Sequence, residues 1–258
     1  MLKRGTLNKN YMEQYLKRLK MNGEISIDFN SLQKIQESHM LTIPFENIDI
    51  ANNIPIKLEI ETLYEKIVRR NRGGYCYELN GLLAWFLDQA GFKLSILSGK
   101  VRRDDGSFGP EFDHMLILVQ LEQEYIVDVG FGNFSRRPLP LTGEAVTDKN
   151  GTYRIKSGQH SNVYYFQQLI EGEWVSGYEF TLKPRSIDDF IEMNYFQQTS
   201  AQSHFTQNFI ASIATSEGRL TISGNSFIET NTSGKQRNEI ETIDERNSLL
   251  KRYFGIVF

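Results

Sequence analysis

The chain has 258 residues, of which 40% are apolar and 24% charged, the composition of an ordinary soluble globular protein. Lys and Arg total 29 against 32 for Asp and Glu, and the resulting net charge of -3 argues against a nucleic-acid-binding protein, which usually carries a basic excess. At this length a single hydrophobic core approaches its size limit, so we expect two or three packed subregions rather than separate domains on linkers.

The sequence predicts neither a membrane partner nor export. No stretch approaches the roughly 18 apolar residues of a membrane-spanning helix, and the longest dense runs are Gly81 to Leu87 and Met115 to Val119. The N-terminal segment MLKRGTLNKNYMEQ is positively charged but lacks the apolar run of a secretory signal. We therefore expect a cytoplasmic protein.

Cysteine and histidine usage argues against a metal site. The single cysteine, Cys76, excludes an internal disulfide and any multi-cysteine zinc or iron-sulfur site. The histidines show no spacing typical of metal ligands, and they are His39, His114, His160 and His204. No bound metal is expected.

The first ninety residues are predicted to form a small helical bundle. Apolar residues recur there at the three- and four-residue steps of an amphipathic helix. Asn30 and the pair Thr62 and Glu65 are candidate N-terminal caps, Pro44 should end one helix, and Gly91 should stop another. The expected helices cover residues 11–19, 30–43, 62–68 and 76–87.

From Lys93 onward the pattern changes to short β-type runs separated by charged or glycine-bearing turns. The clearest are LSILSGKV (94–101), HMLILVQL (114–121) and YIVDVGF (125–131), and residues 153–155 and 163–169 continue the style. These runs predict a sheet or a small barrel in the middle of the chain.

After Pro184 the pattern becomes mixed. Ser186 with Asp189, and Thr242 with Glu245, can cap two helices over residues 187–196 and 246–254, the second closed by Gly255. Residues 218–231 are predicted to form two short strands, and the polar segment 230–242 is predicted to be a loop. The whole chain is thus expected to have an α+β fold.

The segment RGGYCYELN (72–80) is the strongest candidate for chemistry. Its two glycines allow a turn directly before a helix and place Cys76 near the helix N-terminus, where the dipole favours a thiolate. We therefore expect the pKa of this thiol to lie below its ordinary value. Arg72 adds positive charge there, or pairs with an acid such as Glu78. A lone cysteine is more often a small buried apolar residue, so this context alone leaves a structural role open.

A cysteine nucleophile needs a base, and the base needs an orienting partner. His114 opens one predicted strand and Asp128 lies in the next, and period-two alternation places both on the same side of the sheet. A simple hairpin register pairs Leu118 with Asp128 and leaves the two side chains four positions, roughly 13 Å, apart. A bulge or kink near Gly130 or His114 is needed to bring them together.

With these residues in place, the chain resembles the arylamine N-acetyltransferases. The resemblance implies a catalytic triad of Cys76, His114 and Asp128. It also implies a helical bundle over 1–91, a β-barrel over 92–184 and an α/β lid over 185–258, with a core related to papain-like cysteine enzymes. The matching segments, in family order, are HMLTIPFENIDI (39–50), RGGYCYELNGLL (72–83), FDHMLILV (112–119) and VDVGFG (127–132).

The same resemblance implies the reaction and the pocket. An acetyl group would pass from acetyl-CoA to the nitrogen of an arylamine or arylhydrazine by a ping-pong route through acetylated Cys76. Phe45, Phe131 and Phe205 would line the substrate pocket. Asp113 departs from the small or hydroxyl residue common before the histidine, and it could raise the imidazole pKa or face solvent. No phosphate-binding loop motif is present, so the residues that bind coenzyme A stay unassigned.

Two other readings remain open. A papain-like cysteine hydrolase has the same chain order of nucleophile, base and orienter, and acetyl transfer without net hydrolysis separates it from the transferase. A binding protein in which Cys76 is structural is the third reading. Alkylation of Cys76 without functional loss would favour it.

Overall fold

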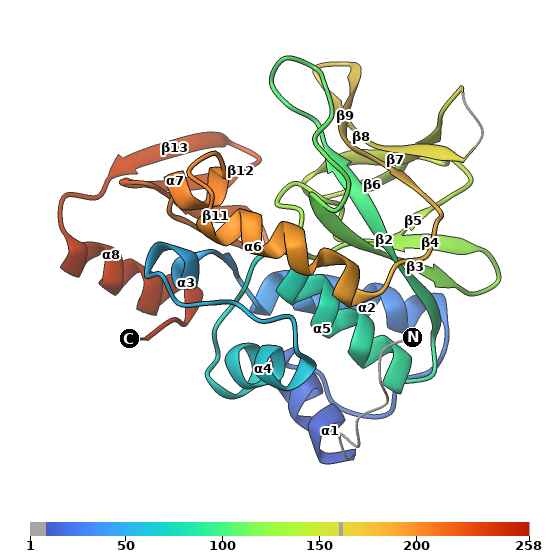
Figure 1. Cartoon of the computed structure of the whole chain (residues 1–258), viewed down its shortest axis with the longest axis horizontal. Helices are drawn as coiled ribbons and strands as arrows, with labels where there is room; N and C mark the ends of the chain where they lie inside the picture. The colour runs from blue at the N-terminus through green and yellow to red at the C-terminus, as the bar shows by residue number, and fades with distance from the viewer. Residues whose placement is uncertain (1–8, 160–161, 258) are drawn as a thin grey trace.

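The computed structural model describes residues 9–159 and 162–257, so His160 and the segment before residue 9 lie outside the described ranges. Helices and strands follow in the predicted order, and the α+β class is confirmed (Figure 1). The helical elements are α1 (Lys9–Arg18), α2 (Phe29–Thr42), α3 (Ile48–Ala51), α4 (Ile60–Tyr64), η1 (Glu65–Arg69), α5 (Cys76–Gln89), η2 (Ile187–Phe190), α6 (Ile191–Thr199), α7 (His204–Gln207), α8 (Ile243–Leu249) and η3 (Leu250–Phe254).

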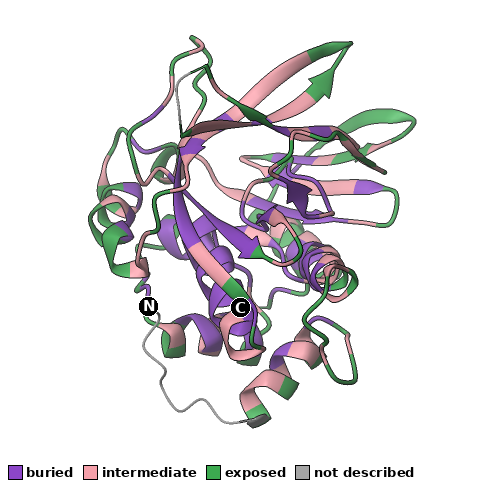
Figure 2. Ribbon diagram, turned by 90° about the vertical axis from the view of Figure 1, so that its right-hand side faces the viewer, coloured by how far each residue is buried: buried purple, intermediate pink, exposed green. Residues whose placement is uncertain are grey.

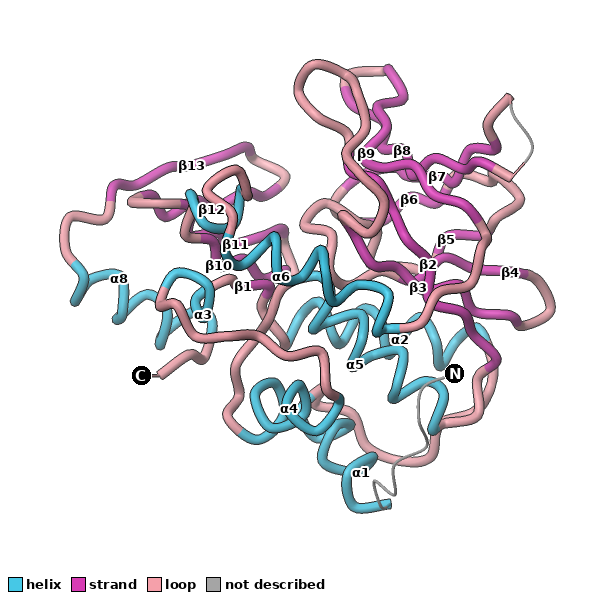
Figure 3. The backbone as a smooth tube through the Cα atoms, viewed as in Figure 1, coloured by secondary structure: helices cyan, strands magenta, loops and turns pink. Residues whose placement is uncertain are grey.

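The strands form two antiparallel sheets, which Figure 3 shows as separate groups with helices in between. Eight strands make the larger sheet, in the order β5-β4-β3-β2-β9-β8-β7-β6, and the smaller has the order β1-β10-β11-β12-β13. Their bounds are β1 (Phe45–Glu46), β2 (Lys93–Val101), β3 (His114–Gln120), β4 (Glu124–Val127), β5 (Leu139–Pro140), β6 (Val146–Asp148), β7 (Gly151–Ser157), β8 (Val163–Ile170), β9 (Glu173–Thr181), β10 (Ile210–Ala214), β11 (Gly218–Ser223), β12 (Ser226–Asn231) and β13 (Gly234–Glu239).

The larger sheet curls into a nearly closed barrel. β5, at one edge of the sheet, packs against β7 near the other edge. Buried aromatic and aliphatic side chains fill the interior, including Phe134, Phe166 and Tyr178. The predicted sheet or small barrel is therefore present.

Helix α5, which begins at Cys76, lies at the centre of the molecule. All twelve residues from Cys76 to Leu87 are buried, because the helix is covered by the barrel strands on one side and by other helices on the other. Figure 2 shows the buried residues gathered where helices and strands meet. Burial on every side explains why this helix is almost wholly apolar.

The smaller sheet joins distant parts of the chain. Its edge strand β1 comes from the N-terminal helical part and pairs with β10 at Phe45↔Ser212. The N-terminal part therefore contributes a strand to the C-terminal part. The division of the chain at 91/92 and 184/185, and the papain-like core, stay predictions.

Several local predictions need correction. The cap of α2 is Asp28, whose carboxylate accepts the Ser31 N–H at 2.7 Å, and not Asn30. Helix α4 begins at Ile60, so Thr62 lies inside it. The segment 230–242 is not a loop, because β13 pairs with β12 along its whole length. The hydrogen bonds of β13 come from its backbone. Because every residue of β13 is exposed, its sequence lacks the apolar alternation from which a strand is predicted.

The helix caps predicted in the C-terminal part of the chain are confirmed. The Asp189 carboxylate accepts the Ser186 N–H at 2.7 Å, and the Thr242 hydroxyl accepts the Glu245 N–H at 3.1 Å. Gly255 ends η3 with a φ of 69°, in the left-handed region that favours glycine.

Candidate active site

The loop before Cys76 is held against the strand that carries Phe45. The Glu46 N–H donates to the Gly74 carbonyl at 2.9 Å, and Phe45 and Gly74 form a parallel bridge. A Cβ on Gly73 would lie 2.0 Å from the Pro44 carbonyl oxygen, so only glycine allows this approach. The glycines therefore serve close backbone packing, with no left-handed turn at either of them.

Cys76 is the first residue of α5 and is 3% exposed. Burial raises the pKa of its thiol well above the ordinary value, and the Asp113 and Asp128 carboxylates raise it further. Backbone hydrogen bonds from Met115 and Tyr77 act in the opposite direction. The expectation of a lowered pKa was wrong, because desolvation of the charged form outweighs the helix terminus.

His114 and Asp128 meet directly. The His114 Nε2 atom lies 2.7 Å from Asp128 Oδ2, and the two side chains are almost fully buried. β3 and β4 pair with Leu118 opposite Ile126, so the register differs by two residues from the predicted one. A register shift of two residues keeps His114 and Asp128 on the same side of the sheet. It reduces their separation along the strands to about 7 Å, a distance that the two side chains span.

The Asp128 carboxylate accepts hydrogen bonds on both oxygens. Oδ1 accepts from the Asn80 side-chain amide at 2.9 Å and from the backbone N–H groups of Gly130 at 2.9 Å and Phe131 at 3.1 Å. Oδ2 accepts from the Tyr178 hydroxyl at 3.0 Å, beside the contact with His114. These donors hold the carboxylate in one orientation.

Asn80 and Tyr178 were not predicted. Asn80 lies four residues after Cys76 and hence on the same face of α5. Its side-chain oxygen Oδ1 accepts the Val129 N–H at 3.0 Å. That spacing within the cysteine motif could have identified it. Tyr178 comes from β9, fifty residues after Asp128 in sequence, and no local pattern connects the two. We call Cys76, His114, Asp128, Asn80 and Tyr178 the catalytic cluster.

Gly130 closes the contact between the barrel and α5. A Cβ there would lie 2.6 Å from the Cys76 Cα atom and 2.8 Å from the Asn80 side-chain nitrogen. Only glycine lets the turn after β4 approach the nucleophile this closely.

One cavity of about 720 Å³ brings most of the predicted site residues together. Cys76 and His114 line it, with Phe45, Phe131 and Phe205. The Phe45 and Phe205 rings lie 6.2 Å apart, whereas the Phe131 ring packs edge-on against His114 at 5.4 Å. We call Phe131, and Phe45 with Phe205, the aromatic walls of the cavity.

Asp113 also lines the cavity and does not simply face solvent. Its Oδ1 accepts from the Gln197 side-chain amide of α6 at 3.0 Å, and burial raises the pKa of its carboxyl group. His204, for which no role was predicted, lines the same cavity from α7. His39, by contrast, is fully buried away from it, and burial lowers its pKa to about 3.

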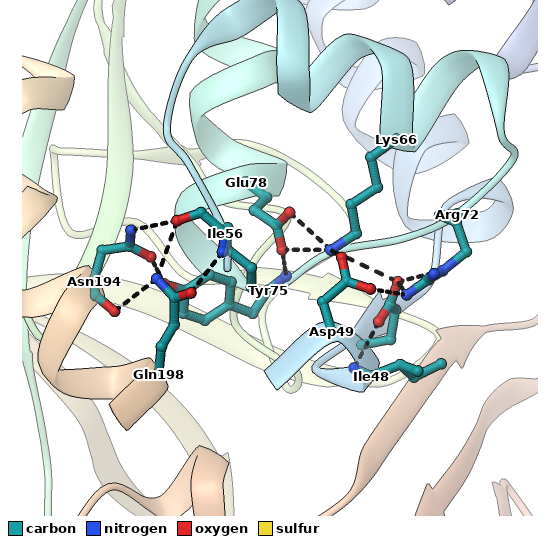
Figure 4. A network of polar contacts seen from close by, with 10 residues as sticks. Ile48, Asp49, Ile56, Lys66, Arg72, Tyr75, Glu78, Asn194 and Gln198 are labelled. Atoms are coloured by element: carbon teal, nitrogen blue, oxygen red, sulfur yellow. Dashed lines mark hydrogen bonds and ion pairs between the residues drawn. The ribbon is translucent and has the colours of Figure 1, made fainter. Parts of the chain in front are cut away.

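A second buried cluster lies on the other side of the first turn of α5 (Figure 4). We call Glu46, Asp49, Lys66, Arg72 and Glu78 the ion-pair cluster. The Lys66 ammonium lies 2.8 Å from both the Glu78 and the Asp49 carboxylates, and Arg72 Nη2 lies 2.9 Å from both Glu46 and Asp49. Arg72 therefore pairs with Glu46 and Asp49.

The ion-pair cluster positions the residue before the nucleophile. Glu78 Oε2 accepts the Tyr75 N–H at 3.1 Å, while its carboxylate is held by Lys66. The Tyr75 hydroxyl hydrogen-bonds to the Asn194 side chain of α6. The start of α5 is thereby fixed from two directions.

The described residues contain no group of three or more His, Cys, Asp or Glu that could hold a metal ion. In the same ranges, no helix combines the length and the apolar character that crossing a bilayer requires.

Comparison with known proteins identifies the family. The profile of the N-acetyltransferase family matches residues 28–258. An arylamine N-acetyltransferase of Mycolicibacterium smegmatis is 34% identical over 219 residues, which cover 81% of this chain and 78% of that protein.

Two solved structures are informative. An arylamine N-acetyltransferase from Bacillus cereus matches with a TM-score of 0.89 at 26% identity, covering 97% of this chain and all of that one, and it has a Cys-His-Glu catalytic triad. The Mycobacterium marinum enzyme in complex with CoA matches with a TM-score of 0.87 at 28% identity, covering 95% of this chain and 92% of that one. In this chain the residue that hydrogen-bonds to His114 is an aspartate, Asp128, and not a glutamate.

Proposed function

This chain belongs to the arylamine N-acetyltransferase family, and we propose that it transfers an acetyl group from acetyl-CoA to the nitrogen of arylamines or arylhydrazines through an acetyl-cysteine intermediate. One observation carries the proposal. His114, whose Nε2 lies 2.7 Å from the buried Asp128 carboxylate, lines the same cavity as Cys76. The Mycobacterium marinum relative, which binds CoA, supports acetyl-CoA as donor.

In the first half-reaction, His114 takes the proton of the Cys76 thiol. Because Asp128 occupies Nε2, the nitrogen that accepts this proton is Nδ1. The thiol pKa is raised by burial, so the thiolate forms only as an ion pair with the imidazolium, which Asp128 stabilises. The sulfur then attacks the thioester carbonyl, the carbon–sulfur bond to coenzyme A breaks, and His114 returns the proton to the departing thiolate.

In the second half-reaction, the neutral amine attacks the acetyl carbonyl on Cys76. The bond from carbon to the cysteine sulfur breaks, and His114 accepts the proton that the nitrogen loses. The backbone N–H of Cys76, at the first position of α5, has no acceptor within the helix and is a suitable donor to the oxyanion.

The aromatic walls suit an aromatic acceptor. Phe131, next to the imidazole, can contact the ring of the amine edge-on or face-on, and Phe45 with Phe205 closes the opposite side. These walls also limit the access of water, which would otherwise hydrolyse the acetyl-enzyme. A cytoplasmic location, in which thiols stay reduced, agrees with the free thiol that the mechanism needs.

Intact mass measurement after mixing with acetyl-CoA in the absence of an amine tests the proposal. We expect one acetyl adduct that maps to Cys76, is absent from Cys76→Ala, and is lost when an arylamine is added, with acetylated arylamine as product. Initial rates at several amine concentrations should give parallel double-reciprocal lines. Release of free acetate without acetylated amine would instead favour the hydrolase, and full activity of Cys76→Ala would remove the covalent route.

A further inference from the structure

Arg219, in β11, brings a positive charge to the cavity that contains Cys76. Its Nη1 donates to the Ser212 hydroxyl of β10 at 3.0 Å, and Ser212 in turn bonds the Thr221 hydroxyl at 2.8 Å. Arg219, Ser212 and Thr221 all line the cavity, so this face of the smaller sheet presents a polar stripe opposite the nucleophile.

No carboxylate balances this charge. Within the described residues, no Asp or Glu oxygen lies within 4.0 Å of the Arg219 guanidinium. Burial and the nearby Arg136 lower its pKa to about 10, so it remains protonated at neutral pH. Largely buried charges in proteins are normally paired, and an unpaired one beside a cavity calls for an anion from outside the chain.

A second cavity extends from the same point. It has a volume of about 450 Å³ and shares three lining residues with the first cavity, Gly132, Asn133 and Arg219. A Cβ on Gly132 would meet nothing within 4 Å, so no neighbouring atom crowds the side-chain position of this shared residue. Lys149 and Glu217 also line the second cavity and pair with each other at 3.9 Å, so their charges offset one another. A long ligand can therefore have one end at Cys76 and the other beyond Arg219.

We propose that Arg219 binds a phosphate group of the acyl donor while the thioester lies at Cys76; this rests on the function proposed above. The donor fits both observations, because acetyl-CoA is long and carries its phosphates far from its thioester. A neutral arylamine between the aromatic walls would occupy the first cavity only and would leave the guanidinium unpaired. A planar guanidinium is also well suited to phosphate oxygens.

The test compares two donors on one half-reaction. The rate of Cys76 acetylation is followed by intact mass, without amine, using acetyl-CoA and the phosphate-free thioester S-acetyl-N-acetylcysteamine. We expect Arg219→Gln to lower kcat/KM for acetyl-CoA by about 10- to 100-fold, the usual range for a charge-assisted hydrogen bond, and to leave the short thioester within about twofold. Arg219→Lys, which keeps the charge, should recover part of the loss.

Arg237→Gln is the matched control. Arg237 also lies on the smaller sheet and donates to a serine hydroxyl, that of Ser226 at 2.8 Å, but it is exposed and outside both cavities. It should leave both donors unaffected.

Three outcomes would overturn this proposal alone, and a fourth would overturn it together with the proposed function. Equal slowing of both donors by Arg219→Gln and Arg219→Lys would mean a structural role. Arg219→Gln could instead slow only the second half-reaction, with 4-aminobenzoate but not with its ethyl ester. That result would mean that Arg219 binds the carboxylate of the amine substrate and not a phosphate of the donor. Unchanged rates with both donors would show that no anion binds there. Failure of both thioesters to acetylate the unaltered protein would contradict the proposed function itself, and this proposal with it.

Discussion

The catalytic cluster and the ion-pair cluster lie on opposite sides of the first turn of α5, and they stabilise buried carboxylates in different ways. Asp128 is surrounded by an amide, a hydroxyl, two backbone N–H groups and an imidazole. Glu46, Asp49 and Glu78 are instead balanced by the cations Lys66 and Arg72.

The difference follows from what each cluster must do. Neutral donors hold Asp128 in place whether His114 is neutral or protonated, so a proton can enter and leave the imidazole without disrupting the site. Paired charges hold their partners strongly but cannot lose one member without leaving another buried and uncompensated. The catalytic cluster suits proton transfer, and the ion-pair cluster suits fixing the start of α5.

The largest expected effect concerns the orienting carboxylate. Asp128→Asn places an amide against His114 Nε2 and favours the wrong tautomer, so kcat should fall by about 10⁴-fold, as in other triads. Asp148→Asn is the control, because Asp148 also accepts backbone N–H groups, from Arg136 and Asn150, without any histidine. A loss below about tenfold for Asp128→Asn would mean that another residue orients the imidazole.

The ion-pair cluster should respond in stability. Lys66→Met removes the cation that lies 2.8 Å from both the Glu78 and the Asp49 carboxylates, and it should cost about 3 to 5 kcal/mol in urea unfolding. The control Lys100→Met removes a partly exposed pair with Glu179 and should cost about 1 kcal/mol or less. Similar losses in both variants would contradict the distinction between the two clusters.

Glu78 should make stability depend on pH. Burial raises the pKa of its carboxyl group to about 7, above the ordinary 4.5 of the unfolded chain. Between these values the native protein keeps a proton that the unfolded chain has released, so stability falls as pH rises through this window. Relative to Glu78→Gln, the unaltered protein should lose on the order of 3 kcal/mol between pH 5 and pH 8 in urea unfolding. The absence of such a relative loss would show that Lys66 keeps Glu78 ionised throughout this range.

The smallest effect should come from Tyr178→Phe. The change removes one of several donors to Asp128 and keeps the ring that packs 5.1 Å from His114. About 1 kcal/mol is expected, hence a less than tenfold fall in kcat. Tyr153→Phe, which removes a hydroxyl from the same barrel away from Asp128, is the control. A loss as large as that of Asp128→Asn would show that the donors are not redundant.

Much of the fold could be predicted because its signals are local. The caps at Ser186, Thr242 and Gly255 act within one turn of the chain, and the apolar run of α5 shows its burial directly. The β13 strand was missed for the opposite reason: its exposed polar residues join the sheet through the backbone, which any sequence can supply.

By itself the sequence determined that Cys76 begins a helix and that His114 and Asp128 point to the same side of a hairpin. Only the tertiary structure decided the register that brings the imidazole to 2.7 Å from the carboxylate, and the direction of the thiol pKa. It also decided which acids pair with Lys66 and Arg72. Desolvation and long-range pairing depend on which distant segments cover a residue, and no local spacing encodes that.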